Sequence, residues 1–245
     1  MQLGALDIEQ VRDGLAAIIP DAVTPDAVAG GLGVAGVAVS PAVGRDNGSV
    51  SLLTPRAVRI GRVLVAPAEV AAPPEALRLT DSTAFGTGHH PTTALCVEAL
   101  EEALTIAVPH SVLDVGTGSG VLALTALIMG VSRAVGLDID ADALNIAAGH
   151  ARLNGLADRL QLVLGGPDVV DGTWPLVVAN VLAAPLIKMA PVLVRRVAHR
   201  GRLILSGIPL SLESEVAQTY QRLGMRHIRS ETRAGWTVLV AQASW

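Results

Sequence analysis

Cysteine, lysine and aromatic residues are scarce in this chain of 245 residues. Its one cysteine, Cys96, cannot form an internal disulfide, which excludes the disulfide-stapled secreted proteins. The first seven residues contain no Lys or Arg, so they do not resemble the start of a secretory signal peptide. We therefore expect a protein of the reducing cytoplasm. One lysine, Lys188, stands among 18 Lys and Arg residues, which we ascribe to compositional bias rather than to mechanism.

Neither an excess of positive charge nor a long apolar run is present. The net charge is -4 and the pI is about 5.8, so nucleic acid is not the expected partner, although a local basic patch stays open. The most apolar long stretch, residues 176–197, is interrupted by Asn180, Pro185, Lys188 and Pro191, whereas a spanning helix needs about 20 predominantly apolar residues. This stretch predicts a buried strand followed by a helix, and we expect no membrane partner.

The length and the apolar fraction of 51% fit one large α/β domain, preceded at most by a small module. Residues 1–70 predict a small α+β module, with apolar residues at helical spacing over 8–19 and short alternating segments at 49–53 and 58–65. Three prolines between positions 67 and 74 favour an extended connector. We place the domain boundary there, so that the second domain covers 71–245.

From Pro91 onward, strand and helix patterns alternate. This order implies right-handed crossovers and a doubly wound, mostly parallel sheet of seven strands. The last two strands are joined by the turn Ala234-Gly235, so one strand is expected to be antiparallel. The expected helices cover 91–104, 120–129, 141–154, 184–197 and 211–223, and the expected strands cover 111–115, 134–137, 160–164, 176–179, 202–206, 227–232 and 236–241.

A glycine-rich turn follows the first of these strands. Gly116, Gly118 and Gly120 alternate there, at the place where open α/β sheets bind ligands. The dinucleotide-binding pattern would need glycine at position 121, which is Val121, and no Walker lysine follows. The G-x-G-x-G spacing instead resembles the S-adenosylmethionine loop of class I methyltransferases. The alternative is a glycine turn that only lets strand and helix pack closely.

Acidic residues follow the next two strands. Asp138, at the end of the second strand, can accept hydrogen bonds from both hydroxyls of an adenosine ribose. Asp140 is interpreted as the cap of the following helix. Asp168, after the third strand, either holds the adenine amino group or is a solvated loop acid.

Asn180 ends the fourth strand, directly after a buried apolar run. An amide in that place is costly unless it is hydrogen-bonded, so it either serves a ligand or satisfies local backbone. We favour the ligand.

The segment 84–93 is the most distinctive part of the sequence. It contains Phe85, the only phenylalanine, which either stabilises a sulfonium by a cation–π contact or plugs the pocket. His89 and His90 are adjacent and would point apart, so we expect no metal site. Cys96 lies on the apolar face of the next helix and is expected to be a core residue rather than a nucleophile.

Taken together, these motifs resemble the PrmA family, the methyltransferases of large-subunit ribosomal protein eleven. The matching pieces lie within about residues 60 to 240, at 84–93, 113–122, 136–140, 154–155, 178–183, 205–208 and 235–236. The resemblance implies a Rossmann-like class I methyltransferase domain, a small N-terminal module for substrate recognition, S-adenosylmethionine as donor, and methylation of protein amino groups.

The resemblance also implies the site residues. The donor is expected at Phe85, Thr87, Asp114, Gly116, Thr117, Gly118, Gly120, Asp138, Ile139, Asp168 and Asn180. Asn180, Thr87 and His89 are expected to orient the acceptor, with the segment around Phe85 acting as a lid. The partner implied is a ribosomal protein. The alternatives are methylation of another protein's lysine or of a small molecule, and a non-catalytic S-adenosylmethionine-binding module.

Overall fold

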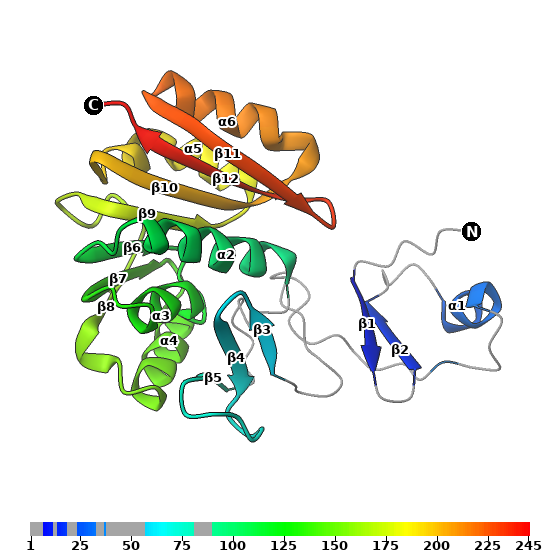
Figure 1. Ribbon diagram of the computed structural model, residues 1–245. Helices are drawn as coiled ribbons and strands as arrows, with labels where there is room; N and C mark the ends of the chain where they lie inside the picture. The colour runs from blue at the N-terminus through cyan, green and yellow to red at the C-terminus, as the bar shows by residue number, and fades with distance from the viewer. Residues whose placement is uncertain (1–6, 12–13, 19–23, 33–36, 38–56, 81–89) are drawn as a thin grey trace.

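The computed structural model describes residues 7–11, 14–18, 24–32, 37, 57–80 and 90–245 (Figure 1). Within these ranges the chain forms a seven-stranded sheet, a three-stranded sheet and a two-stranded sheet. The seven-stranded sheet and the helices on its two faces contain the candidate site.

The seven-stranded sheet has the strand order β11-β12-β10-β9-β6-β7-β8. Strand β12 is antiparallel to both of its neighbours, and the other neighbouring pairs are parallel. The predicted α/β fold with a mostly parallel, seven-stranded sheet and one antiparallel strand is therefore confirmed. The strands are β6 (Ser111–Val115), β7 (Arg133–Asp138), β8 (Leu160–Leu164), β9 (Trp174–Asn180), β10 (Val197–Pro209), β11 (Met225–Arg233) and β12 (Trp236–Ala243).

Helices cover both faces of this sheet. Helices α2, α3 and α4 contribute to one core cluster and α5 and α6 to the other; in Figure 1, α2 and α3 lie on the near side and α5 on the far side. Along β9, Leu176 and Val178 face the first cluster while Val177 and Ala179 face the second, as expected for a strand buried on both faces. The helices are α2 (Pro91–Ile106), α3 (Val121–Ile128), α4 (Ala141–Leu153), α5 (Ala183–Val194) and α6 (Glu213–Arg222), with short 3₁₀ turns at Ala157–Arg159 and Leu210–Leu212.

The apolar stretch 176–197 forms β9 and then α5, as predicted. Among the helices of the described ranges, none combines the length and the hydropathy that a membrane span requires.

A small sheet of order β3-β4-β5 precedes α2. Its strands are β3 (Val58–Ile60), β4 (Val63–Pro67) and β5 (Leu77–Leu79), and β4 pairs in parallel with β5 through Val65 and Leu77. Both side chains join the core cluster that contains α2 and α3. Strand β5 follows the proline-containing stretch expected to be a connector, and its pairing with β4 spans the boundary placed at residue 70. That boundary stays a prediction.

The N-terminal part differs from the expectation. Residues 8–19 were predicted as a helix, but the chain forms an antiparallel pair, β1 (Asp7–Val11) with β2 (Gly14–Ile18), so this prediction is wrong. Gly14 disfavours a helix by about 1 kcal/mol, and its pairing with Val11 leaves two intervening residues, the commonest hairpin length. Helix α1 (Pro25–Leu32) follows, starting at a proline. The predicted strand at 49–53 lies outside the described residues.

Candidate functional site

Three neighbouring strands end side by side at the carboxyl edge of the large sheet. Val115 of β6 is in register with Leu137 of β7 and with Ala179 of β9. The residues that follow, Asp138 and Asn180, therefore flank the turn after β6. Strand order changes direction between β6 and β9, and open α/β sheets bind ligands at such a point.

The glycine turn after β6 adopts a conformation that other residues rarely take. Gly116, Gly118 and Gly120 have φ angles of 72°, 53° and 81°. A Cβ atom on Gly116 would lie 2.5 Å from Cγ2 of Val181, and one on Gly120 would lie 3.1 Å from Cβ of Ala147. The glycines thus serve close packing as well as the backbone conformation.

Asp114 supports this turn from inside the protein. Its side chain is fully buried, and its Oδ2 accepts hydrogen bonds from Oγ1 of Thr117 (2.7 Å) and from the backbone N–H of Ala123 in α3 (3.1 Å). Its Oδ1 is buried and has no partner among the described residues. Burial, with a smaller contribution from the nearby Asp138, raises the pKa of Asp114 to about 7 although the hydrogen bonds from Thr117 and Ala123 lower it. Asp114 and the buried Thr117, both predicted in the donor site, thus stabilise the turn from its buried side.

Asp138, the last residue of β7, contacts the same turn from the neighbouring strand. Its Oδ2 accepts from the N–H of Gly118 (2.9 Å), and its Oδ1 accepts from the N–H of Asp140 (3.0 Å). An ionised carboxylate has about four lone-pair sites, so it can accept further hydrogen bonds. Ile139, the next residue, is 84% exposed and offers an apolar surface beside it. Asp140 caps α4 by accepting from the N–H of Asp142 (2.9 Å), which confirms its interpretation as a cap.

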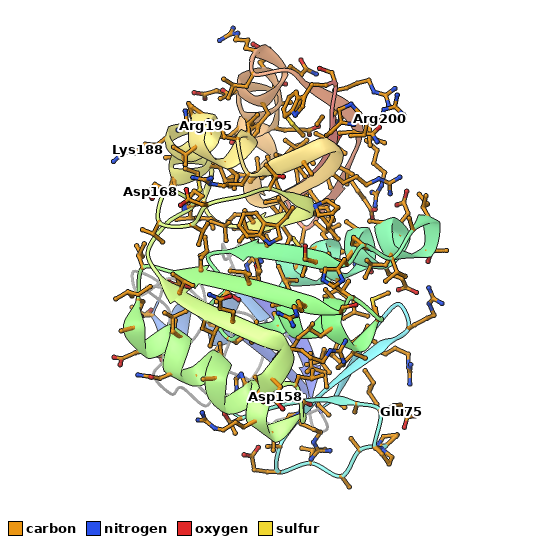
Figure 2. The ribbon with its side chains drawn as sticks, turned by 90° about the vertical axis from the view of Figure 1, so that its left-hand side faces the viewer. Glu75, Asp158, Asp168, Lys188, Arg195 and Arg200 are labelled. Atoms are coloured by element: carbon orange, nitrogen blue, oxygen red, sulfur yellow. The ribbon has the colours of Figure 1, made fainter. Side chains whose placement is uncertain are left out.

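Asp168 lies in the loop between β8 and β9, and this loop begins beside Asp138, whose carbonyl accepts from the N–H of Gly165 (2.7 Å). The preceding carbonyl, that of Pro167, accepts a hydrogen bond from Nε of Arg196 (2.8 Å), and the carbonyl of Arg196 accepts from the N–H of Trp174 (2.8 Å), where β9 begins. Figure 2 shows Asp168 on the same side as Lys188 of α5. The side chain of Asp168 is exposed. Both expected roles, the contact to adenine and the solvated loop acid, stay predictions.

Asn180 contributes an unpaired acceptor to the edge. Its side-chain oxygen Oδ1 is buried and has no hydrogen-bond partner among the described residues. A buried polar atom without a partner costs about 1–3 kcal/mol. Its backbone is already paired with Ser206 of β10 in the sheet. The side chain is thus not used to satisfy local backbone, and this favours the ligand role expected for it.

Val181, which the sequence did not single out, fixes the position of Asn180. Its side chain occupies the space above Gly116, and its carbonyl oxygen lies 2.4 Å from where a Cβ atom on Gly207 would stand. Its N–H donates to the carbonyl of Ser206 (3.0 Å). Gly116 after β6 and Gly207 within β10, one on each side of β9, are the sequence signal that could have revealed this close packing.

Apolar side chains rim the same edge. Ile139 follows β7, Leu182 comes two residues after β9 and is 62% exposed, and Leu210 follows β10 and is also exposed. Leu164, the last residue of β8, is exposed as well. Large apolar side chains that gather in one exposed place mark binding surfaces.

Phe85, Thr87 and His89 lie outside the described residues, so their predicted roles stay predictions. The segment that contains them is preceded by Thr80 and followed by His90. His90 caps α2, with its Nδ1 2.7 Å from Oγ1 of Thr92, and its ring contacts the edge of Trp236 at 5.3 Å between centroids.

The core assignment of Cys96 is confirmed. Its thiol is fully buried, and burial raises its pKa, which makes it a poor nucleophile. Across the described part of the chain, no group of three or more His, Cys, Asp or Glu side chains is placed to hold a metal ion.

Comparison with known proteins gives consistent matches. The family model for "Ribosomal protein L11 methyltransferase (PrmA)" matches residues 53–244. Ribosomal protein L11 methyltransferases of Geobacter sulfurreducens and Nitrosomonas europaea are each 42% identical, over 68% and 69% of this chain but 54% and 56% of their own lengths. The chain thus spans about half the length of these curated relatives. The crystal structure of ribosomal protein L11 methylase from Lactobacillus delbrueckii subsp. bulgaricus matches with a TM-score of 0.72 and 28% identity, over 78% of this chain and 100% of that one.

Proposed function

The chain belongs to the ribosomal protein L11 methyltransferase (PrmA) family, and we propose that it transfers methyl groups from S-adenosylmethionine to amino groups of a protein. We further propose that the acceptor is a ribosomal protein of the L11 type and that the reaction takes place in the cytoplasm. The names of the matched relatives support the acceptor. Those relatives are longer than this chain, so their activity is proposed for it and not carried over directly.

Two unpaired oxygens carry the proposal. Oδ1 of Asp114 and Oδ1 of Asn180 are both buried without a partner among the described residues, and they belong to adjacent strands, β6 and β9. Gly116 directly follows β6, and the side chain of Val181, the residue after Asn180, packs against it. Buried polar groups are rarely left unpaired unless a ligand or water completes them. These residues therefore fit a polar ligand at the glycine turn.

The β6–β7 side would hold the donor. Asp138 would accept hydrogen bonds from the ribose hydroxyls while keeping its bond to Gly118, and the exposed Ile139 would cover the base. When bound, S-adenosylmethionine supplies a methyl group that is already activated by a sulfonium.

The β9–β10 side would hold the acceptor. The side-chain oxygen of Asn180 would accept an N–H of the incoming amine and orient its lone pair. Leu182 and Leu210 would exclude water from the amine. A lysine amine has an unperturbed pKa of about 10.4 and must be neutral to react, and less polar surroundings lower that pKa. Thr87 and His89 are proposed to assist this orientation.

Calorimetry with S-adenosylmethionine tests the donor site. The purified protein should bind it, and Asp138→Ala should weaken binding about tenfold or more, since hydrogen bonds to charged groups contribute about 1.5–3 kcal/mol. Asp140→Ala is the matched control because it removes a helix cap two residues away. Absence of binding by the unaltered protein would refute the donor assignment.

Labelled donor tests the acceptor. Incubation with purified ribosomal protein L11 and, separately, with a cell lysate should label the ribosomal protein in both. Label confined to another protein or to the small-molecule fraction would overturn the ribosomal acceptor. Donor binding without label in any fraction would indicate a non-catalytic binding module.

A further inference from the structure

A buried histidine joins the glycine turn to the end of β5. His150 lies on α4 and is 1% exposed. Its Nδ1 is 2.8 Å from the carbonyl oxygen of Ser119, and its Nε2 is 3.0 Å from the backbone N of Thr80. Ser119 stands between Gly118 and Gly120 in the turn. One imidazole ring thus contacts two segments that are 39 residues apart in the chain.

The two contacts define the tautomer of this ring. The backbone N–H of Thr80 is a donor, so Nε2 must be the unprotonated acceptor. Nδ1 then carries the hydrogen and donates to the carbonyl of Ser119. The neutral ring satisfies both partners, and burial lowers the pKa of His150, which favours the neutral form.

Asn154 continues the same arrangement one helical turn later. Its Oδ1 accepts from the N–H of Arg78 (2.8 Å) and its Nδ2 donates to the carbonyl of Arg78 (2.7 Å). Residues four apart share one helix face, so His150 contacts Thr80 while Asn154 contacts Arg78. The two side chains thus bind the backbone of this segment as a neighbouring strand would. The end of β5 is fixed to α4 by side chains at both positions.

Resting on the proposed function, we propose that His150 is a positioning residue for donor binding, which fixes the carbonyl of Ser119 in the glycine turn to Thr80 at the end of β5. The N–H of Gly118, which precedes Ser119, is the group that Asp138 accepts. If the carbonyl of Ser119 lost its hydrogen bond to His150, the turn would no longer fix the position of Gly118 relative to Asp138.

Substitutions at His150 separate this role from a purely structural one. His150→Leu removes the hydrogen bonds of the ring to the carbonyl of Ser119 and to the backbone N–H and hydroxyl of Thr80, and it should weaken binding of S-adenosylhomocysteine about tenfold, as measured by calorimetry. His150→Asn places an amide N–H near the position of Nδ1 and should restore most of the affinity. His150→Gln reaches the position of Nε2 instead and should restore less of it. His227→Leu, at an exposed histidine of β11, is the matched control and should bind as the unaltered protein does.

The outcomes distinguish the two proposals. If all three variants at His150 melt at lower temperature but bind S-adenosylhomocysteine with unchanged affinity, the positioning role is refuted and the proposed function stands. If the unaltered protein does not bind, the proposed function fails first.

A second measurement needs no variant. The ¹⁵N chemical shifts of histidine-labelled protein should show His150 in the neutral Nδ1–H tautomer. An Nε2–H or doubly protonated ring at neutral pH would contradict the proposed hydrogen bonds of His150 to Ser119 and Thr80.

Discussion

The two sides of the carboxyl edge are organised differently. On the β6–β7 side, the carboxylates of Asp114 and Asp138 accept hydrogen bonds from the glycine turn and the start of α3. On the β9–β10 side, Asn180 keeps an unpaired oxygen, and its position follows from the packing of Val181 between two glycines. Hydrogen bonds shape the first side and close packing shapes the second.

This difference matches what each side is proposed to bind. A donor with many polar groups needs a fixed set of partners, and hydrogen bonds prepared in advance supply them without reorganisation. An amine needs one acceptor that nothing else has satisfied. An unpaired oxygen held in place by packing meets that need at a cost in stability.

The largest effect is expected where packing shapes the site. Gly116→Ala and Gly207→Ala should each lower the methylation rate on the order of 100-fold, because small displacements of reacting groups cost about that much. Both glycines have positive φ angles, and both new methyl groups would meet Val181. Initial rates with labelled donor measure the loss.

Adding Val181→Ala tests whether packing is the cause. At Gly116 the clash is with Cγ2 of Val181, so the second substitution should recover part of the rate. At Gly207 the clash is with the carbonyl oxygen and backbone carbon of Val181, so no recovery is expected. Equal recovery in both pairs would contradict the packing account.

A smaller effect is expected at Asn180. Asn180→Ala should lower kcat about tenfold and leave the dissociation constant of S-adenosylmethionine nearly unchanged, since the side-chain oxygen is proposed to serve the acceptor. The melting temperature should stay the same or rise, because an unpaired buried oxygen is removed. Single-turnover kinetics and thermal denaturation provide the two measurements. Weaker donor binding with unchanged kcat would place Asn180 on the donor side.

The smallest effect is a pH dependence of stability from Asp114. Its pKa is about 7 in the folded protein, against an ordinary value of 3.8. The folded state therefore binds the proton more tightly, and this contribution to stability is lost as pH rises from about 4 to 7. The free energy of unfolding of Asp114→Asn, minus that of the unaltered protein, should increase over this range by more than about 1 kcal/mol. Urea denaturation at several pH values measures it, and a flat difference would contradict it.

His150 contributes with the opposite sign. Burial lowers its pKa from 6.5, so its contribution is present above that value and is lost as pH falls below it. Comparing variant and unaltered protein at each pH cancels the contribution of His150 and isolates that of Asp114.

The sequence predicted the elements from Pro91 onward well, because strand and helix periodicities are regular there and buried runs such as that of β9 are continuous. Asp138 and Asn180 were predictable for a related reason, since polar residues directly after buried strands meet at one edge. The glycine turn was recognisable from its spacing alone.

Residues whose role depends on distant contacts escaped prediction. Val181 looks like any apolar residue after a strand, and only the approach of Gly116 and Gly207 gives it a role. His150 pairs with Thr80 across 70 positions of sequence. At the N-terminus, the spacing of apolar residues suggested a helix where Gly14 and its neighbours form a hairpin.

The scarcity of lysine has a practical consequence for experiments on this protein. Its only lysine, Lys188, lies exposed on α5, as Figure 2 shows. Any self-methylation of a lysine side chain in an assay would produce a single modified peptide, which mass spectrometry can recognise and subtract. Among the side chains, an amine-reactive fluorophore would likewise label this lysine alone, with the N-terminal amine as the other reactive group.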